Sequence, residues 1–133
     1  MGIKANECSG AALAYLGDAV LEVCVRELLV KSGLSSSARL NSTALEYVKA
    51  SKQAEAMKKI LPILTEEEEA VFRRGRNIGH TNTPKSATVS EYRIATGMEA
   101  LFEYLHLEGR KERIAELFAA AYENEITETN NMQ

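Results

Sequence analysis

The chain has 133 residues, of which 45% are hydrophobic, so it fits one globular domain with its own core and not a disordered segment. The 16 basic and 19 acidic residues give a formal charge of −3, which taken alone argues against a partner held by bulk positive charge. Three of the acids fall in residues 123–133, however, so the rest of the chain carries equal numbers of acidic and basic residues.

The first predicted helix covers residues 13–30, which are apolar on almost every side and should therefore form a central, covered helix. Gly33 is expected to end it. Asp18, the only aspartate of the chain, follows Gly17 inside this segment. Because aspartate is a poor helix former, either its position was selected for chemistry, or the segment from Leu16 to Asp18 breaks the helix and Asp18 caps the next one. The local sequence leaves both interpretations open.

A second helix is predicted from the serines at 35–37 toward Leu61, where a proline limits it. Thr65 and Glu68 then form a capping box that opens a third helix. The acidic run 66–69 suits the N-terminal end of this helix, where the helix dipole favours negative charge.

The third helix leads into a basic segment with two glycines. Residues 71–93 contain five cations and one acid, for a local charge of +4. Arginine suits phosphate oxygens and glycine lets a backbone approach closely, so the segment has the chemistry of a phosphate site. The alternative is a charged loop that is simply solvated. The cations are Arg73, Arg74, Arg76, Lys85 and Arg93.

A second capping box, Thr88 with Glu91, opens a long apolar helix that continues through Leu105. Gly109 is expected to end it, and a final helix follows that reaches Tyr122. The alternation typical of strands is absent throughout the sequence.

These patterns predict an all-α fold of about five main helices, two of them central. We expect one domain over residues 1–122 and a polar, acidic C-terminal tail over 123–133. The N-terminus lacks the apolar core of a signal peptide, and no apolar run is long enough to span a bilayer. Cys8 and Cys24 form no CxxC pair, which is typical of a reduced, cytoplasmic protein.

Glu99 lies in the long central helix among small and apolar residues, in a setting similar to that of Asp18. Two bare carboxylates on two buried helices would be costly, and a divalent cation between them would remove that cost. Mg²⁺ prefers such oxygen ligands. The alternative is that Glu99 belongs to an exposed stripe with Glu103, one turn later.

Four blocks of sequence, in this order, resemble Mini-ribonuclease III, the short bacterial branch of the ribonuclease III family. They are LAYLGDAVLE at 13–22, RGRN at 74–77, HTNTPK at 80–85 and YRIATGMEAL at 92–101. The resemblance covers roughly residues 10–122.

The resemblance implies a ribonuclease III-like fold in which Asp18 and Glu99, on adjacent central helices, bind the catalytic Mg²⁺, with Mn²⁺ as a possible substitute. It implies an endoribonuclease that hydrolyses double-stranded RNA to 5′-phosphate and 3′-hydroxyl ends, in maturation of precursor 23S ribosomal RNA. It also implies a homodimer, for which the first and last helices offer apolar residues. The RNA would contact Arg73, Arg74, Arg76, Asn77 and Lys85.

The chain departs from the longer ribonuclease III pattern at two positions, where Ala14 replaces a glutamate and Thr96 replaces an aspartate. Both changes fit the Mini branch, but they leave few ligands, so waters, RNA phosphates and an auxiliary Glu22 or Glu55 would complete the metal shell. One-metal and two-metal mechanisms both stay open. The longer relatives also carry a separate RNA-binding domain, so we expect this chain to bind RNA through its catalytic domain. The alternative function is a non-catalytic RNA-binding or ribosome-assembly module of the same fold.

Overall fold

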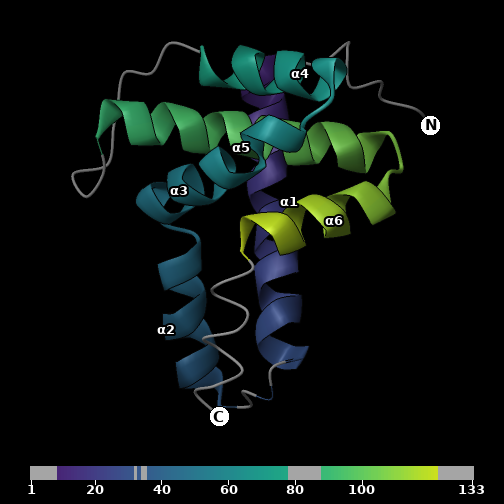
Figure 1. Ribbon diagram of the computed structural model, residues 1–133. Coiled ribbons are helices and arrows are strands. Elements are labelled where there is room, and N and C mark those ends of the chain that lie inside the picture. Colours follow the sequence, from purple (N-terminus) through teal and green to yellow (C-terminus); the bar gives the residue numbers. More distant parts are fainter. Residues whose placement is uncertain (1–8, 32, 34–35, 78–87, 123–133) are drawn as a thin grey trace.

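The structure, a computed structural model, describes residues 9–31, 33, 36–77 and 88–122 (Figure 1). These residues form six α-helices and one short 3-10 helix, and no strand occurs among them. The all-α prediction is therefore confirmed. The helices are α1 (Gly10–Lys31), α2 (Ser37–Tyr47), α3 (Ala50–Ile60), η2 (Leu61–Ile63), α4 (Glu66–Arg76), α5 (Val89–Leu107) and α6 (Lys111–Ala121).

Helix α5 is the centre of the fold. Helix α1 crosses behind it, α4 runs alongside it, and α3 and α6 pack against it as well (Figure 1). Its side chains are buried on several sides, and Met98, Leu101, Phe102 and Leu105 have no exposed surface. Burial of such large apolar side chains on all sides is the main stabilising contribution in a domain of this size. No described helix has the length and apolarity needed to cross a membrane.

Two expectations about helix continuity were wrong. The predicted second helix is in fact α2 and α3, separated at Val48 and Lys49. The chain turns there because α2 packs against α1 whereas α3 packs against α5, and Tyr47 at the turn is buried with its ring 6.1 Å from that of Tyr122. Conversely, α1 runs without interruption through Leu16 and Asp18, so the helix-break interpretation of that segment is also wrong.

Both capping boxes are present. Thr65 Oγ1 accepts a hydrogen bond from the Glu68 backbone at 3.2 Å, and the Glu68 carboxylate accepts one from the Thr65 backbone at 2.9 Å. Thr88 and Glu91 make the same pair of bonds. The carboxylate of Glu68 is buried and also accepts two hydrogen bonds at 2.8 Å from Arg113 of α6. The Arg113 guanidinium lowers the pKa of Glu68 and ties α6 to the start of α4.

Candidate active site

Helices α1 and α5 touch backbone to backbone at Gly17 and Glu99. A Cβ atom added to Gly17 would lie 1.6 Å from the carbonyl oxygen of Glu99, and this distance is too short for any side chain. Only glycine allows this approach, and this explains why a residue that weakens helices stands inside α1. The crossing brings Asp18, the next residue of α1, to the side chain of Glu99.

The carboxyl groups of Asp18 and Glu99 interact directly. Burial, the charge of Asp18 and a hydrogen bond between the two carboxyl groups together raise the pKa of Glu99 to about 8, and burial is the largest of these causes. Near neutral pH the pair therefore holds a proton in the absence of a cation. Asp18 is exposed and Glu99 half-buried, so solvent reaches the pair from the Asp18 side.

The alternative interpretation of Glu99 as part of an exposed stripe with Glu103 is wrong. Glu103 is only 3% exposed, and burial raises the pKa of its carboxyl. Glu99 and Glu103 therefore lie where neighbouring helices cover α5.

The pair has the donor chemistry that a hard divalent cation prefers, because two oxygen ligands face each other and one of them is reluctant to ionise alone. Within the described part of the chain, no group of three or more His, Cys, Asp or Glu side chains lies close enough to hold a metal. Glu22 is instead paired with Arg26 at 2.7 Å, and Glu55 is exposed on α3. The two glutamates named as auxiliary ligands thus do not join the pair in such a group.

The two positions that depart from the longer ribonuclease III pattern offer no ligand here. Ala14 is buried on α1. Thr96 is buried too, and its hydroxyl donates a hydrogen bond of 2.9 Å to the backbone carbonyl of Tyr92. This leaves the Asp18–Glu99 pair with open coordination positions that water or a phosphate oxygen can fill.

The predicted basic residues gather at the C-terminal end of α4. Arg73 forms an ion pair with Glu69 one turn earlier. Arg76 lies over the Phe72 ring, with its guanidinium carbon 5.6 Å from the ring centroid, and its Nε donates to Asn77 Oδ1 at 3.2 Å.

Arg74 is exposed in the same last turn of α4. Lys85, with the HTNTPK block, lies outside the described residues. The structure thus describes four of the five predicted RNA contacts and gathers them at one end of one helix.

Glycines also allow α4 to pack closely against α5. A Cβ on Gly75 would meet the Cα atom of Gly97 at 2.9 Å, and one on Gly97 would meet the Phe72 ring at 2.7 Å. This close packing fixes the basic end of α4 relative to the helix that carries Glu99.

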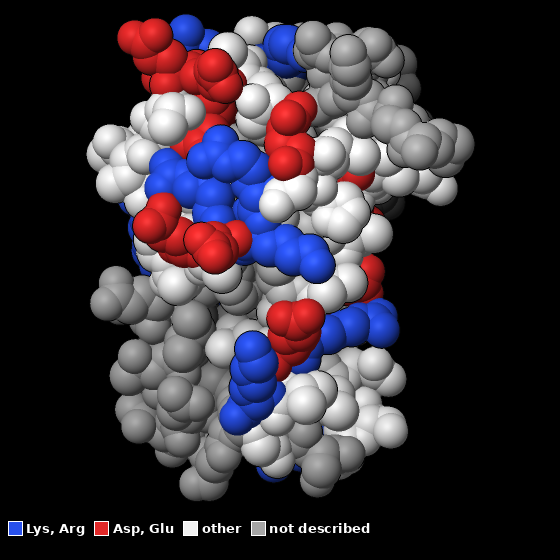
Figure 2. Space-filling view, turned by 90° about the vertical axis from the view of Figure 1, so that its right-hand side faces the viewer, with Lys and Arg blue, Asp and Glu red and all other residues white. Residues whose placement is uncertain are grey.

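The opposite end of the molecule has a different charge pattern. There α5 turns into α6, and Figure 2 shows basic side chains bordered by acidic ones. A shallow hollow at this turn is lined by three acids and three cations, which leaves no net charge to attract an anion. The residues are Glu108, Arg110, Lys111, Glu112, Arg113 and Glu116.

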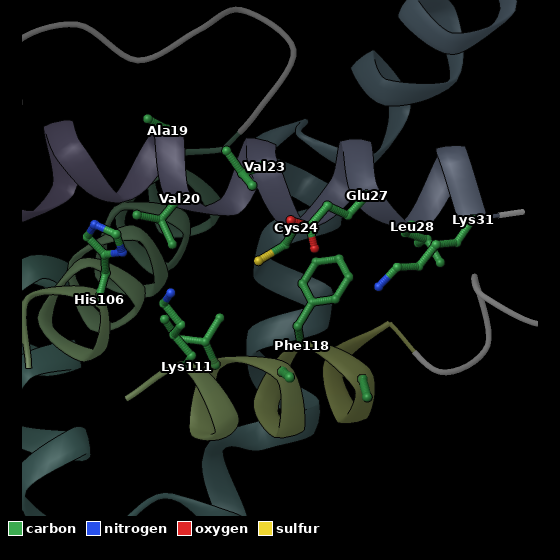
Figure 3. A pocket seen from close by; sticks show the side chains of 13 residues that line it. Ala19, Val20, Val23, Cys24, Glu27, Leu28, Lys31, His106, Lys111 and Phe118 are labelled. Carbon is green, nitrogen blue, oxygen red and sulfur yellow. The ribbon is translucent and has the colours of Figure 1, made fainter. Parts of the chain in front are cut away.

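An apolar groove of about 620 Å³ lies between α1 and α6 (Figure 3). Val20 and Cys24 of α1 face Phe118 of α6 across it, and lysines stand at both ends. Burial and the nearby Glu27 raise the pKa of the Cys24 thiol to about 11, so the thiol stays protonated.

Sequence reasoning missed this groove and the role of Gly17. A glycine directly before a lone aspartate inside an apolar helix was the available signal for a close helix crossing.

The chain as a whole is similar to known proteins. The family described as Ribonuclease III domain matches residues 11–110. The Mini-ribonuclease 3 of Symbiobacterium thermophilum is 48% identical over 82% of this chain and 84% of its own length. The Mini-ribonuclease 3 of Enterococcus faecalis is 45% identical over 84% of this chain and 86% of its own length.

A solved structure is similar as well. The crystal structure of protein FN1578 from Fusobacterium nucleatum superposes with a TM-score of 0.81 at 31% identity, covering 90% of this chain and 92% of that one. The similarity therefore spans the whole helical domain, including both helices of the Asp18–Glu99 pair.

Proposed function

This chain belongs to the ribonuclease III family, in its Mini-ribonuclease 3 branch, and from that membership we propose that Asp18 and Glu99 are the catalytic, Mg²⁺-binding carboxylates of its endoribonuclease activity on double-stranded RNA. The observation that carries the proposal is the direct contact between these two carboxyl groups where α1 crosses α5. Mn²⁺, with the same preference for oxygen ligands, is expected to substitute.

A divalent cation at this pair supplies positive charge to the phosphate that is attacked and to the leaving oxygen, without any proton transfer by the cation itself. Asp18 and Glu99 would hold that cation, and Glu99 would be ionised in the metal-bound state. Asp18 is exposed, so it is the side of the pair that a phosphodiester approaches. Water is the attacking group, and hydrolysis leaves a 5′-phosphate and a 3′-hydroxyl.

RNA binding in this proposal uses the basic end of α4. A-form RNA is bound mainly through its shape, its phosphates and its 2′-hydroxyls, and arginine matches phosphate oxygens. Arg73, Arg74, Arg76 and Asn77 meet that need, with Lys85 from the segment that follows. The natural substrate in this proposal is precursor 23S ribosomal RNA, processed in the cytoplasm.

A homodimer is the second part of the proposal. The outer face of α1 exposes large apolar side chains, with Tyr15 81%, Val23 54% and Val30 63% exposed. The apolar groove between α1 and α6 adjoins this face. Contiguous apolar surface of this kind is typical of a protein interface, and a two-fold dimer would present two carboxylate pairs to one RNA helix.

The experiment that tests the catalytic assignment replaces Asp18 by asparagine, which keeps the size of the side chain and removes its charge. With Mg²⁺ present, we expect Asp18→Asn to cleave a structured ribosomal RNA precursor far more slowly than the wild type. The decrease in rate should exceed the roughly 10- to 100-fold that is typical of changes around a metal site. Binding of the same RNA should persist. Glu112→Gln, which removes an exposed carboxylate on α6, is the matched control and should cleave normally.

Cleavage by Asp18→Asn at the wild-type rate would disprove the assignment. The specific alternative is a non-catalytic RNA-binding module, because Ala14 and Thr96 supply no metal ligand. It would be favoured if the wild type bound RNA but formed no product at any Mg²⁺ or Mn²⁺ concentration.

A further inference from the structure

Arg93 is an exposed cation near the start of α5. It belongs to the basic segment 71–93 but is not one of the five residues assigned to RNA binding above. Gly97 comes four residues later and therefore shares its side of the helix. That side is the one that packs on α4, because Gly97 contacts Phe72 and Gly75. Arg93 thus projects from the α4 side of α5, one turn beyond this contact.

The C-terminal end of α4 lies near the same part of α5 as Arg93. Figure 1 shows α4 and α5 running in opposite directions, side by side. The residues that follow Gly75 on α4 therefore lie toward the part of α5 that precedes Gly97. Arg76 and Asn77 end α4 there, so Arg93 adjoins the basic end of α4.

The charge of Arg93 is not neutralised within the described part of the chain. Its neighbours one turn away on α5 are Val89, Ser90, Thr96 and Gly97, none of which is charged. The carboxylate of Glu91 is engaged in the capping box with Thr88. By contrast, two other exposed helix arginines pair with an acid one turn earlier: Arg26 with Glu22 and Arg73 with Glu69.

Arg93 lies on the same helix as Glu99. It precedes Glu99 by six residues, which is a rise of about 9 Å, and at 3.6 residues per turn the two side chains lie about 120° apart around the helix axis. The guanidinium of an arginine binds phosphate oxygens in pairs.

We infer that Arg93 binds a backbone phosphate of the RNA beside the basic end of α4, and so extends the phosphate contacts of α4 onto the helix that carries Glu99. The inference rests on the proposed function, because it concerns RNA held at the Asp18–Glu99 pair. A guanidinium is weakly hydrated, so partial desolvation of Arg93 costs little, and a phosphate gives it the counter-charge that the described part of the protein does not supply.

The test measures binding of a labelled RNA duplex in the presence of a chelator, which prevents cleavage, over a series of salt concentrations. Loss of one phosphate contact should lower the slope of log affinity against log salt by about 1. We expect this decrease, and a several-fold weaker affinity, for Arg93→Ala. Arg93→Lys keeps the charge and should retain the wild-type slope.

Arg39→Ala is the matched control. Arg39 is equally an exposed helix arginine, but it lies on α2, which packs against α1 and α3 and not beside the end of α4 (Figure 1). Its removal changes the net charge by the same amount and should leave the slope unchanged. Melting temperatures of all variants verify that the fold is intact, since exposed substitutions rarely change stability by more than about 0.5 kcal/mol.

A wild-type slope for Arg93→Ala would overturn the inference, and so would an equal decrease for Arg93→Ala and Arg39→Ala, which would indicate only a general charge effect. In either case, cleavage by the wild type and its loss in Asp18→Asn would leave the proposed function standing. If the wild type binds no duplex RNA in a salt-dependent way, the inference and the proposed function fail together.

Discussion

At the scale of single residues, the carboxyl group of Glu99 destabilises the folded protein when it is ionised. In the unfolded chain it ionises near its ordinary pKa of 4.5, whereas in the folded protein without metal its pKa is about 8. Between these values the folded protein holds a proton that the unfolded chain has lost. The contribution of Glu99 therefore makes the free energy of unfolding fall as pH rises from about 4.5 to about 8.

Glu99→Gln removes this titration and keeps the shape of the side chain. We expect the melting temperature of the wild type, measured by circular dichroism with a chelator present, to fall more steeply over that pH range than that of Glu99→Gln. Glu112→Gln should follow the wild type, because that carboxyl is exposed on α6. Parallel curves for the wild type and Glu99→Gln would show that burial next to Asp18 does not control the ionisation of Glu99.

At the scale of secondary-structure elements, the site depends on how closely α1 and α5 cross. Glycine inside a helix normally costs about 0.5–1 kcal/mol relative to alanine. At Gly17 the balance is reversed, since the added methyl group would enter the backbone of Glu99. Backbone atoms cannot rotate away as a side-chain end can, so the two helices must separate.

We expect Gly17→Ala to lower the free energy of unfolding by about 3 kcal/mol, the upper part of the range for overpacked cores. Urea unfolding measures this loss. Separation of α1 from α5 should also weaken Mn²⁺ binding, followed by calorimetry in the protein that remains folded.

Gly97→Ala is the comparison, because it disturbs the packing of α4 on α5 and leaves the α1 crossing in place. It should lose stability and keep Mn²⁺ affinity. A Gly17→Ala protein as stable as the wild type would contradict the proposed backbone contact.

At the scale of the whole molecule, three surfaces differ in charge and polarity: the two ends of the molecule and the outer face of α1. The end with the last turn of α4 and the first part of α5 is basic, whereas the turn between α5 and α6 mixes both signs of charge. The outer face of α1 is apolar and exposed. In the proposed function, the RNA helix and the second copy of the protein would therefore bind on different surfaces.

Val23→Glu tests the dimer, because it places a charge on the exposed apolar face of α1. We expect the wild type to sediment at twice the monomer mass and Val23→Glu to sediment as a monomer with an intact helical fold. Val89→Glu is the matched control, since Val89 on α5 has the same exposure of 54% as Val23. A wild type that stays monomeric at all concentrations, or a Val23→Glu variant that still dimerises, would contradict the proposed interface.

Much of the fold follows from local sequence patterns. The capping boxes at Thr65 and Thr88 and the apolar run that forms α1 were predicted and are confirmed, because each depends on residues within a few positions of one another. The division of residues 36–61 into α2 and α3 was not predicted. It depends on which distant helix each half packs against, and no local pattern encodes that.

The sequence by itself determined the candidates for the chemistry: one aspartate and one glutamate in two apolar helices, and a cluster of arginines with glycines beside it. Only the tertiary structure decided that Asp18 meets Glu99 and that Gly17 makes the meeting possible. It also decided that Glu103 is buried, that Glu22 is paired elsewhere, and that Arg93 adjoins the end of α4. The physical reason is that pairing energies, burial and pKa values depend on distances between helices, and those distances are fixed only when the whole core packs.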